Sequence, residues 1–253
     1  MTPFVNPFVK RRADAPDGLF AAEAAGLEWL RAADGAPVVT VIGWTPASIT
    51  LERLTPAQPT RAAAEAFGAQ LAVTHDAGAS AFGVGPDGHT GPNFIADLPM
   101  TCDPEPTWGA FFGRQRIWPY ARQAATALGA DGLRVMETLV ERLAAGVFDD
   151  DAPPARLHGD LWAGNLVFTD AGCVLIDPST HGGHRVSDLA MLALFGAPHL
   201  TRIFAAYEAA SPCLQTDWRR LIGLHQVYPL LVHTVLFGGS YAQQAVRAAR
   251  AYL

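Results

Sequence analysis

The sequence is poor in charged residues and in cysteine, and it has no long apolar run. Only 17% of its 253 residues are charged and 50% are hydrophobic, which excludes an intrinsically disordered chain. The three cysteines, Cys102, Cys173 and Cys213, are odd in number and lack the spacing of metal ligands. We therefore expect reduced thiols and neither a disulfide framework nor a cysteine metal site.

Basic residues are too few to suggest a nucleic-acid or anionic membrane partner. The net charge is -6, the pI is about 5.7, and Lys10–Arg12 is the only basic triplet. The N-terminus lacks the apolar core of a signal peptide. The most apolar late stretch, residues 227–238, is too short to span a bilayer and contains Pro229 and His233. We expect a cytoplasmic protein that is a monomer and acts on a small molecule.

The first 54 residues read as a small lobe of strands and one helix. Residues 4–10 form a short strand candidate, and a helical pattern opens near residue 18 and ends at Gly35. Two strand candidates follow at residues 38–42 and 49–53. The Pro-containing segment LTPAQPT then resembles a hinge.

Residues 55–253 read as a second, mainly helical lobe. Thr60 should cap a helix that runs to about His75, and Gly-rich residues 78–92 should form a loop. Further expected elements are a helix capped by Thr107 and interrupted at Pro119, a helix from Asp131 to Gly146, strands at 166–168 and 173–176, a helix from Ser187, and three late helices. The predicted fold class is α+β and bilobal: residues 1–54 bind nucleotide and residues 55–253 hold the catalytic and substrate-binding groups.

One segment of the second lobe carries polar residues in a spacing that suits phosphoryl transfer. His158-Gly159-Asp160 is followed by Asn165, and Asp177 comes after a predicted hairpin. Phosphoryl transfer needs a carboxylate that accepts the proton of the attacking hydroxyl, together with oxygen ligands for Mg²⁺. The protein-kinase catalytic loop has the same Asp-to-Asn interval and a metal-binding aspartate beyond a hairpin. The pattern predicts Asp160 as the catalytic base, Asn165 and Asp177 as Mg²⁺ ligands, and ATP as the donor.

A purely structural interpretation competes with this one. Asp and Asn are ordinary loop residues whose side chains satisfy backbone amides. The His-Gly prefix and the Ile-Asp-Pro sequence at the end of the hairpin favour the functional interpretation. His158 is expected to be a structural hydrogen-bonding residue, and Phe111 and Phe112 are expected mostly in the core, with an aromatic wall to the substrate pocket as the alternative.

A kinase-type cleft also needs a cation for the nucleotide phosphates, held by an acid on a neighbouring helix. Lys10 ends the first strand candidate and Glu23 lies on the helix after it, so we expect the two to pair. Considered alone, they would be read as an exposed lysine and an ordinary helix glutamate. Glu52 and Leu54, where the last strand of the lobe meets the hinge, are expected to offer backbone groups to adenine.

Several segments together resemble the fructosamine kinase (ketosamine-3-kinase) family, which is related to the aminoglycoside phosphotransferases within the protein-kinase-like fold. The main segments are LHGDLWAGN (157–165), IDPS (176–179) and GHRVSDLAMLALFG (183–196). FVK near the start and LERL at the hinge also match. The resemblance covers nearly the whole chain, and HGDLWxGN joined to GHRxxDLAM is far more specific than HGD alone.

The resemblance implies the same roles for the loop residues and for the Lys10–Glu23 pair, and it adds three positions. Asp188 would brace the catalytic loop by hydrogen bonds. Trp162 and His184 would line the sugar pocket.

The family phosphorylates a sugar hydroxyl of ketosamines, such as fructosamines and ribulosamines, that form when sugars attach to amines. The resulting 3-phosphate is unstable and releases the amine, so the resemblance implies a deglycation enzyme that uses ATP and Mg²⁺. Glycated proteins and small glycated metabolites are both open as substrates. The alternatives are phosphorylation of an aminoglycoside or another amino sugar, and a catalytically inactive binding protein with the kinase fold.

The sequence departs from the family at its start. Family members usually carry a Gly-containing nucleotide loop and two strands before the Phe-Val-Lys segment, whereas nine residues precede Lys10 and none is glycine. Two explanations are open: a truncated or misassigned start, or a subgroup with a reduced small lobe. Because fewer backbone amides would cover the phosphates, we expect weak ATP affinity.

Overall fold

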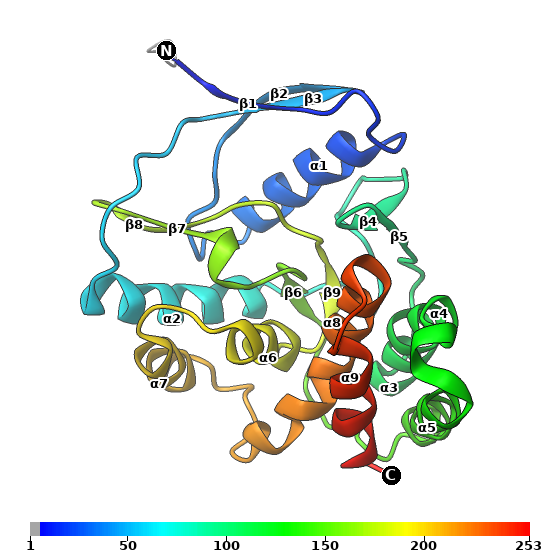
Figure 1. Cartoon of the computed structure of the whole chain (residues 1–253). Helices are drawn as coiled ribbons and strands as arrows, with labels where there is room; N and C mark the ends of the chain where they lie inside the picture. Colours follow the sequence, from blue (N-terminus) through cyan, green and yellow to red (C-terminus); the bar gives the residue numbers. More distant parts are fainter. Residues whose placement is uncertain (1–5) are drawn as a thin grey trace.

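The computed structural model describes residues 6–253, and the first elements form a small sheet with one helix below it (Figure 1). The strands are antiparallel and lie in the order β1-β3-β2. The inward residues Ile49 and Leu51 are buried, whereas Trp44 is 51% exposed. The bounds are β1 (Phe8–Arg11), α1 (Leu19–Arg31), β2 (Val41–Thr45) and β3 (Ser48–Leu51).

The strand positions differ from those expected. The candidate at 4–10 begins outside the described residues, and the strand that is described ends at Arg11. β2 begins and ends about three residues later than predicted, so the hairpin turn to β3 is shorter than predicted. The register of the β2–β3 pair shifts between Val41 and Gly43. Val38, expected in this strand, instead forms a parallel bridge with Leu175 of the second lobe.

The two predicted lobes share backbone hydrogen bonds. The Leu175 amide donates to the Pro37 carbonyl (2.8 Å), and the Val39 amide donates to the Leu175 carbonyl (3.0 Å). The connecting segment is also held, because the Ala57 amide donates to the Phe168 carbonyl (2.8 Å). Buried apolar residues form one continuous core on both sides of residue 54. The boundary between residues 54 and 55 stays a prediction.

Helix α1 is fixed to the second lobe over its C-terminal half. A Cβ on Gly26 would lie 2.7 Å from the Thr180 hydroxyl, so the two segments touch closely. The Trp29 indole donates to Asp87 (3.1 Å), and Arg156 donates to the Trp29 carbonyl (2.6 Å) with its guanidinium 4.6 Å from the indole centroid. The helix is therefore anchored near its middle and at its C-terminal end.

The second lobe is mainly helical, as predicted. Thr60 caps α2 by accepting a hydrogen bond from the Ala63 amide (3.1 Å). This helix packs closely on α7, because a Cβ on Gly68 would lie 2.2 Å from the Ile203 carbonyl oxygen. The helices here are α2 (Arg61–Asp76), α3 (Trp108–Phe111), α4 (Trp118–Gln123), α5 (Ala125–Ala144), α6 (Val186–Phe195), α7 (Leu200–Ala210), α8 (Ile222–Phe237) and α9 (Tyr241–Arg250).

One helix prediction needs correction. Thr107 caps α3 as expected, but Pro119 does not interrupt the helical path. A π-helical segment, Phe112–Ile117, precedes it, and Pro119 lies in the first turn of α4, where a missing N–H is tolerated. α5 is divided at Gly129, whose positive φ is non-helical, so the longer part of this helix begins close to Asp131, as predicted.

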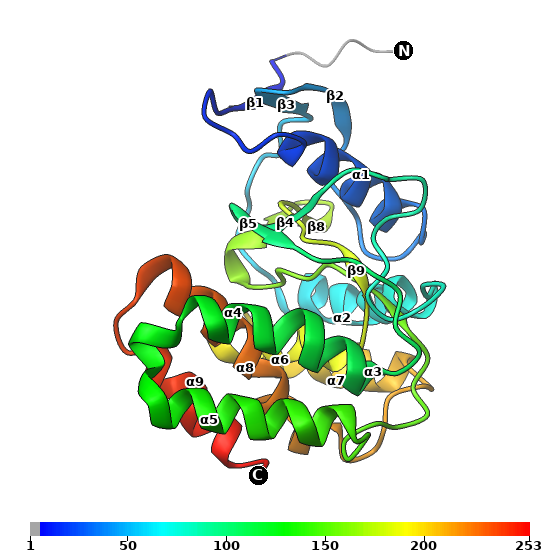
Figure 2. The ribbon, with the colours of Figure 1, turned by 90° about the vertical axis from the view of Figure 1, so that its right-hand side faces the viewer.

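Three short two-stranded sheets complete the fold of residues 6–253. The β4–β5 hairpin, which the sequence did not predict, lies between α1 and helices of the second lobe (Figure 2). β6 pairs with β9 and β7 pairs with β8, so both predicted strands after the HGD segment are confirmed. The bounds are β4 (Asn93–Ile95), β5 (Leu98–Met100), β6 (Ala155–Leu157), β7 (Leu166–Thr169), β8 (Gly172–Leu175) and β9 (His181–Gly183), with a 3₁₀ turn at Ala163–Asn165 and another at Trp218–Leu221.

Within residues 6–253, no helix combines the length and apolar character needed to cross a bilayer. The three cysteines are free, as expected.

Candidate active site

The loop between β6 and β7 carries the HGD sequence, and α6 holds its backbone. Asp188 is 1% exposed and accepts hydrogen bonds from the amides of His158 (2.8 Å) and Gly159 (2.9 Å). Burial alone would raise the pKa of Asp188, but hydrogen bonds from His75 and the Gly159 amide outweigh burial, so the pKa is lowered. Asp188 therefore stays charged and has the contacts expected of a brace.

Gly159 is required by its surroundings. Its φ is +81°, and a Cβ there would lie 2.0 Å from the Ser179 carbonyl oxygen. The Ser179 amide in turn donates to the His158 carbonyl (2.8 Å), so the loop and the segment after Asp177 are tightly joined. This contact explains why glycine stands before Asp160.

His158 has the structural role that we expected. The ring Nε2 donates to the Ile176 carbonyl (2.9 Å), which leaves Nδ1 to accept a hydrogen bond from the Asp160 amide (3.2 Å). Because both ring nitrogens are engaged and the residue is fully buried, His158 orients the loop and is not available as a base.

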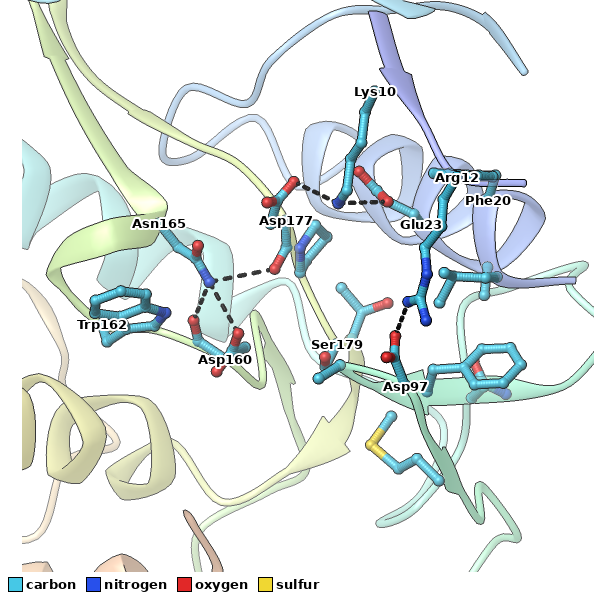
Figure 3. Close-up of a pocket in the computed structure, with 18 residues that line it drawn as sticks. Lys10, Arg12, Phe20, Glu23, Asp97, Asp160, Trp162, Asn165, Asp177 and Ser179 are labelled. Atoms are coloured by element: carbon cyan, nitrogen blue, oxygen red, sulfur yellow. Dashed lines mark hydrogen bonds and ion pairs between the residues drawn. The ribbon is translucent and has the colours of Figure 1, made fainter. Parts of the chain in front are cut away.

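Asn165 joins the two aspartates that the spacing singled out. The side-chain nitrogen donates to the Asp160 carboxylate (3.0 Å), the Asp160 carbonyl (2.8 Å) and the Asp177 carbonyl (3.3 Å) (Figure 3). Burial raises the pKa of Asp160, which makes its carboxylate a better proton acceptor than an exposed one, although His158 and the Asn165 hydrogen bond oppose the shift. The three predicted residues are therefore one hydrogen-bonded group.

The oxygens left over in this group fit a Mg²⁺ ion. Among residues 6–253, neither Oδ1 of Asn165 nor Oδ2 of Asp177 receives a hydrogen bond, because the contacts of these side chains use Nδ2 and Oδ1 respectively. No cluster of three His, Cys, Asp or Glu residues suited to a metal occurs in the described part of the chain. Mg²⁺ usually takes one or two protein oxygens and completes its shell with water and phosphate, so two oxygen donors are enough.

The Lys10–Glu23 pair is present at the same place. Lys10 Nζ lies 3.0 Å from Glu23 Oε2 and 3.2 Å from Asp177 Oδ1, so the lysine from β1 joins α1 to the segment after β8 (Figure 3). Burial by itself lowers the pKa of Lys10, but the two carboxylates outweigh it and the pKa is raised. Burial raises the pKa of Glu23 to about 7, against the opposing effect of Lys10. The lysine is therefore charged, and its phosphate-binding role stays a prediction.

Two adjoining pockets meet at Lys10 and Asp177. The loop pocket, of about 300 Å³, contains Asp160, Trp162 and Asn165 in its lining. The hinge pocket, of about 400 Å³, is lined by apolar side chains and by the hinge; its residues are Phe8, Lys10, Val39, Leu51–Leu54, Pro56, Val167, Ile176 and Asp177.

The hinge residues lie where the sequence put them. Glu52 and Leu54 both line the hinge pocket. The Glu52 amide donates to the Thr40 carbonyl (2.9 Å) and its side chain accepts from the Thr40 amide (3.0 Å), so the hinge backbone is fixed. Within residues 6–253, the Glu52 carbonyl and the Leu54 amide have no hydrogen-bond partner, which leaves one acceptor and one donor for an adenine edge.

Trp162 lines the loop pocket and is 41% exposed. Its ring covers Gly164, because a Cβ on that glycine would lie 2.3 Å from the indole. The absence of a side chain at Gly164 therefore allows the indole to lie in this position. The predicted contact of Trp162 with the sugar stays a prediction.

The structure corrects one position in the predicted sugar pocket. His184 is 3% exposed, bonds to Asp150 (3.2 Å) and packs on Trp108, so it lies in the core and not in the lining of the loop pocket. Phe111 and Phe112 lie in the core, as expected, at 1% and 2% exposed, and neither lines the loop pocket, so the alternative of an aromatic wall is not supported. The motif match could not show the burial, because it depends on helices distant in sequence.

Other lining residues were missed. The loop pocket also includes Arg12 and the β4–β5 residues Asn93, Phe94 and Asp97. His75 was read only as a helix residue, yet it hydrogen-bonds Asp188 (3.1 Å) below the catalytic loop. The hairpin was concealed by Pro99 within β5 and by the Gly-rich loop that precedes it. Nothing in the sequence signals contacts between positions so far apart.

Comparisons with known proteins agree with this geometry. The family model described as fructosamine kinase matches residues 5–253. A probable ketoamine kinase of Enterococcus faecium is 31% identical over 242 residues, covering 94% of this chain and 84% of the relative. The structure of a protein assigned as a fructosamine-3-kinase from Thermobifida fusca is 47% identical with a TM-score of 0.88, covering 97% of this chain and 84% of the other.

A more distant structure shows the fold alone. A choline/ethanolamine kinase family protein from Mesorhizobium loti has 16% identity and a TM-score of 0.58, covering 98% of this chain and 88% of the other. The bilobal kinase-like fold predicted from the sequence is confirmed.

Proposed function

Because the chain belongs to the fructosamine kinase family, we propose that it transfers the γ-phosphoryl group of ATP to a hydroxyl of a fructosamine or ribulosamine. Membership makes the chain a phosphotransferase with an alcohol group as acceptor. The observation that carries the proposal is the grouping of Asp160, Asn165 and Asp177 with the Lys10–Glu23 pair beside one pocket.

Asp160 would accept the proton of the attacking sugar hydroxyl. Its burial favours proton uptake, and the hydrogen bond from Asn165 fixes the orientation of the carboxylate. Lys10, held between Glu23 and Asp177, would neutralise charge on the nucleotide phosphates. A Mg²⁺ ion held by the free oxygens of Asn165 and Asp177 would supply further charge neutralisation when bound.

The arrangement of the two pockets suggests where each part of the substrates would lie. Adenine would lie in the hinge pocket against Phe8, with its edge on the Glu52 carbonyl and the Leu54 amide. The phosphates would pass Lys10 and Asp177, which belong to both pockets, and the sugar would occupy the loop pocket beside Asp160. The phosphorylated ketosamine would then release its amine, so the reaction would serve deglycation.

Purified protein incubated with ATP, Mg²⁺ and a panel of fructosamines, ribulosamines and aminoglycosides tests the proposal. ADP release and phosphorylated products are followed by mass spectrometry, and we expect turnover with ketosamines. Turnover with aminoglycosides alone would show that the proposed acceptor is wrong, whereas the proposed kinase activity would stand. Binding of ATP without any turnover across the panel would instead indicate an inactive kinase-like binding protein.

A further inference from the structure

Residues 8, 10 and 12, in the first strand and directly after it, follow the path proposed for the substrates. Phe8 lines only the hinge pocket, Lys10 lines both pockets, and Arg12 lines only the loop pocket. Side chains two residues apart point to the same face of a strand. Arg12 directly follows β1 and its amide still donates to the Ala47 carbonyl (3.0 Å), so the alternation continues through Arg12 and the three side chains form one row. Arg12 therefore lies beyond the position of the phosphates, in the part of the cleft left for the acceptor.

Arg12 meets Asp97, at the tip of the β4–β5 hairpin, across this end of the loop pocket. Figure 3 shows their ion pair at one end of the labelled residues, while Asp160 and Trp162 lie at the other. Arg12 also donates from Nε to Asp14 (3.2 Å). Within residues 6–253, Nη2 of Arg12 and Oδ2 of Asp97 have no partner, so one donor group and one acceptor remain for a ligand.

The pair is poorly suited to a purely stabilising role. Arg12 is 34% exposed and Asp97 is 48% exposed, and ion pairs at such sites contribute little to stability. Arg12 and Asp97 are accompanied by Asp14, so these side chains carry no excess positive charge and do not form a site for a lone anion. They match a ligand that carries a carboxylate and an ammonium group on neighbouring atoms.

We propose that the acceptor is the ketosamine of a free α-amino acid, with Arg12 binding the carboxylate and Asp97 binding the secondary ammonium group. The inference rests on the proposed function and names its substrate class. The free Nη2 group of Arg12 can donate a charge-assisted hydrogen bond to a carboxylate, and such a bond is stronger than one to an uncharged carrier. The pocket volume of about 300 Å³ lies at the small end of the range for ligand sites and suits a sugar joined to a small carrier.

Two matched acceptors test the proposal: the fructose ketosamine of glycine and that of glycinamide. They have nearly the same size and the same secondary ammonium group, and they differ in the carboxylate. Initial rates of ADP release with ATP and Mg²⁺ give kcat/KM for each. We expect the wild-type protein to favour the carboxylate on the order of tenfold or more, mainly through KM.

Three variants assign that preference to a residue. Arg12→Gln should bring the ratio of the two kcat/KM values near one, and Arg12→Lys should give an intermediate ratio because lysine binds as a point charge. Arg11→Gln is the matched control, since Arg11 is a neighbouring exposed arginine in the lining of neither pocket, and it should keep the wild-type ratio.

Three results would overturn the inference and leave the proposed function standing. One is equal kcat/KM for the two acceptors in the wild-type protein. Another is an Arg12→Gln variant that slows both acceptors by the same factor, as expected if the ion pair only holds the hairpin. The third is turnover of other ketosamines but of neither probe. If the protein phosphorylates no ketosamine at all, the proposed function itself is wrong.

Discussion

At the scale of single residues, Asp160 combines partial access to a pocket with burial of its charge. It lines the loop pocket, receives a hydrogen bond from Asn165 and has a raised pKa because burial disfavours the ionised form. A carboxylate with a raised pKa and a fixed orientation is suited to take a proton from a sugar hydroxyl.

Asp160→Asn should lower turnover by about 10²–10⁴-fold, because the amide cannot accept the proton. ATP binding, measured by calorimetry, should stay close to that of the wild-type protein, since Asp160 does not line the hinge pocket. Asp170→Asn, at an exposed turn between β7 and β8, is the control. Near-normal turnover in Asp160→Asn would exclude the residue as the base.

Asp177→Ala should weaken ATP binding more with Mg²⁺ than without it. The carboxylate has one oxygen against Lys10 and one free, and the free oxygen is the expected metal ligand. Titration calorimetry with and without Mg²⁺ measures both affinities. An equal loss under the two conditions would indicate that Asp177 acts through Lys10 alone.

Glu23 should make folding stability depend on pH. Burial raises its pKa in the folded protein to about 7, from 4.5, so between these values the folded state binds a proton that the unfolded state releases. The contribution of Glu23 to the free energy of unfolding should therefore fall as pH rises through this window, by at most about 1.4 kcal/mol per pH unit.

Urea unfolding at several pH values measures this contribution as the difference between the wild-type protein and Glu23→Gln. Glu28→Gln, an exposed position on the same helix, should show the wild-type slope. Parallel stability profiles for wild type and Glu23→Gln would contradict a raised pKa.

At the scale of elements, the sequence predicted what local rules determine. Thr60 caps α2, Gly146 follows α5, and the hairpin after Asn165 has the expected strands, because caps, positive φ and alternation are properties of short segments. The β4–β5 hairpin was missed because Pro99 lies within β5 and the preceding loop is rich in glycine. The close approach of Arg12 and Asp97 was beyond prediction, since it depends on how the three-stranded sheet and the β4–β5 hairpin pack.

In the catalytic loop, Gly164 leaves room for the side chain of Trp162. Gly164→Ala should displace the indole of Trp162, whose ring atoms lie where the new methyl group would be. The ring is the free end of a side chain, so the fold should survive. We expect KM for the ketosamine to rise several-fold and the Kd for ATP to stay unchanged. Unchanged acceptor kinetics would mean that Trp162 does not contact the sugar.

At the scale of the whole molecule, the two predicted lobes behave as parts of one structure. The core is continuous across residue 54, and Leu175 exchanges hydrogen bonds with Pro37 and Val39. The sequence suggested a hinge because prolines mark residues 54–60, but prolines give no information about the backbone pairing on either side.

Thermal unfolding should therefore be a single transition, because breaking the sheet of the small lobe would also expose core residues of the large one. Scanning calorimetry should give a calorimetric enthalpy equal to the van't Hoff enthalpy. A separate early transition, abolished or shifted by saturating ATP, would show that the small lobe unfolds independently.

The anchoring of α1 has a consequence for regulation. Protein kinases are switched by moving the helix that carries the glutamate partner of the nucleotide lysine. In this chain the close contact of Gly26 with Thr180, together with the bonds from Trp29 to Asp87 and from Arg156 to Trp29, opposes such a swing. The enzyme would then be constitutively active once folded, and the supply of glycated substrate would set its output.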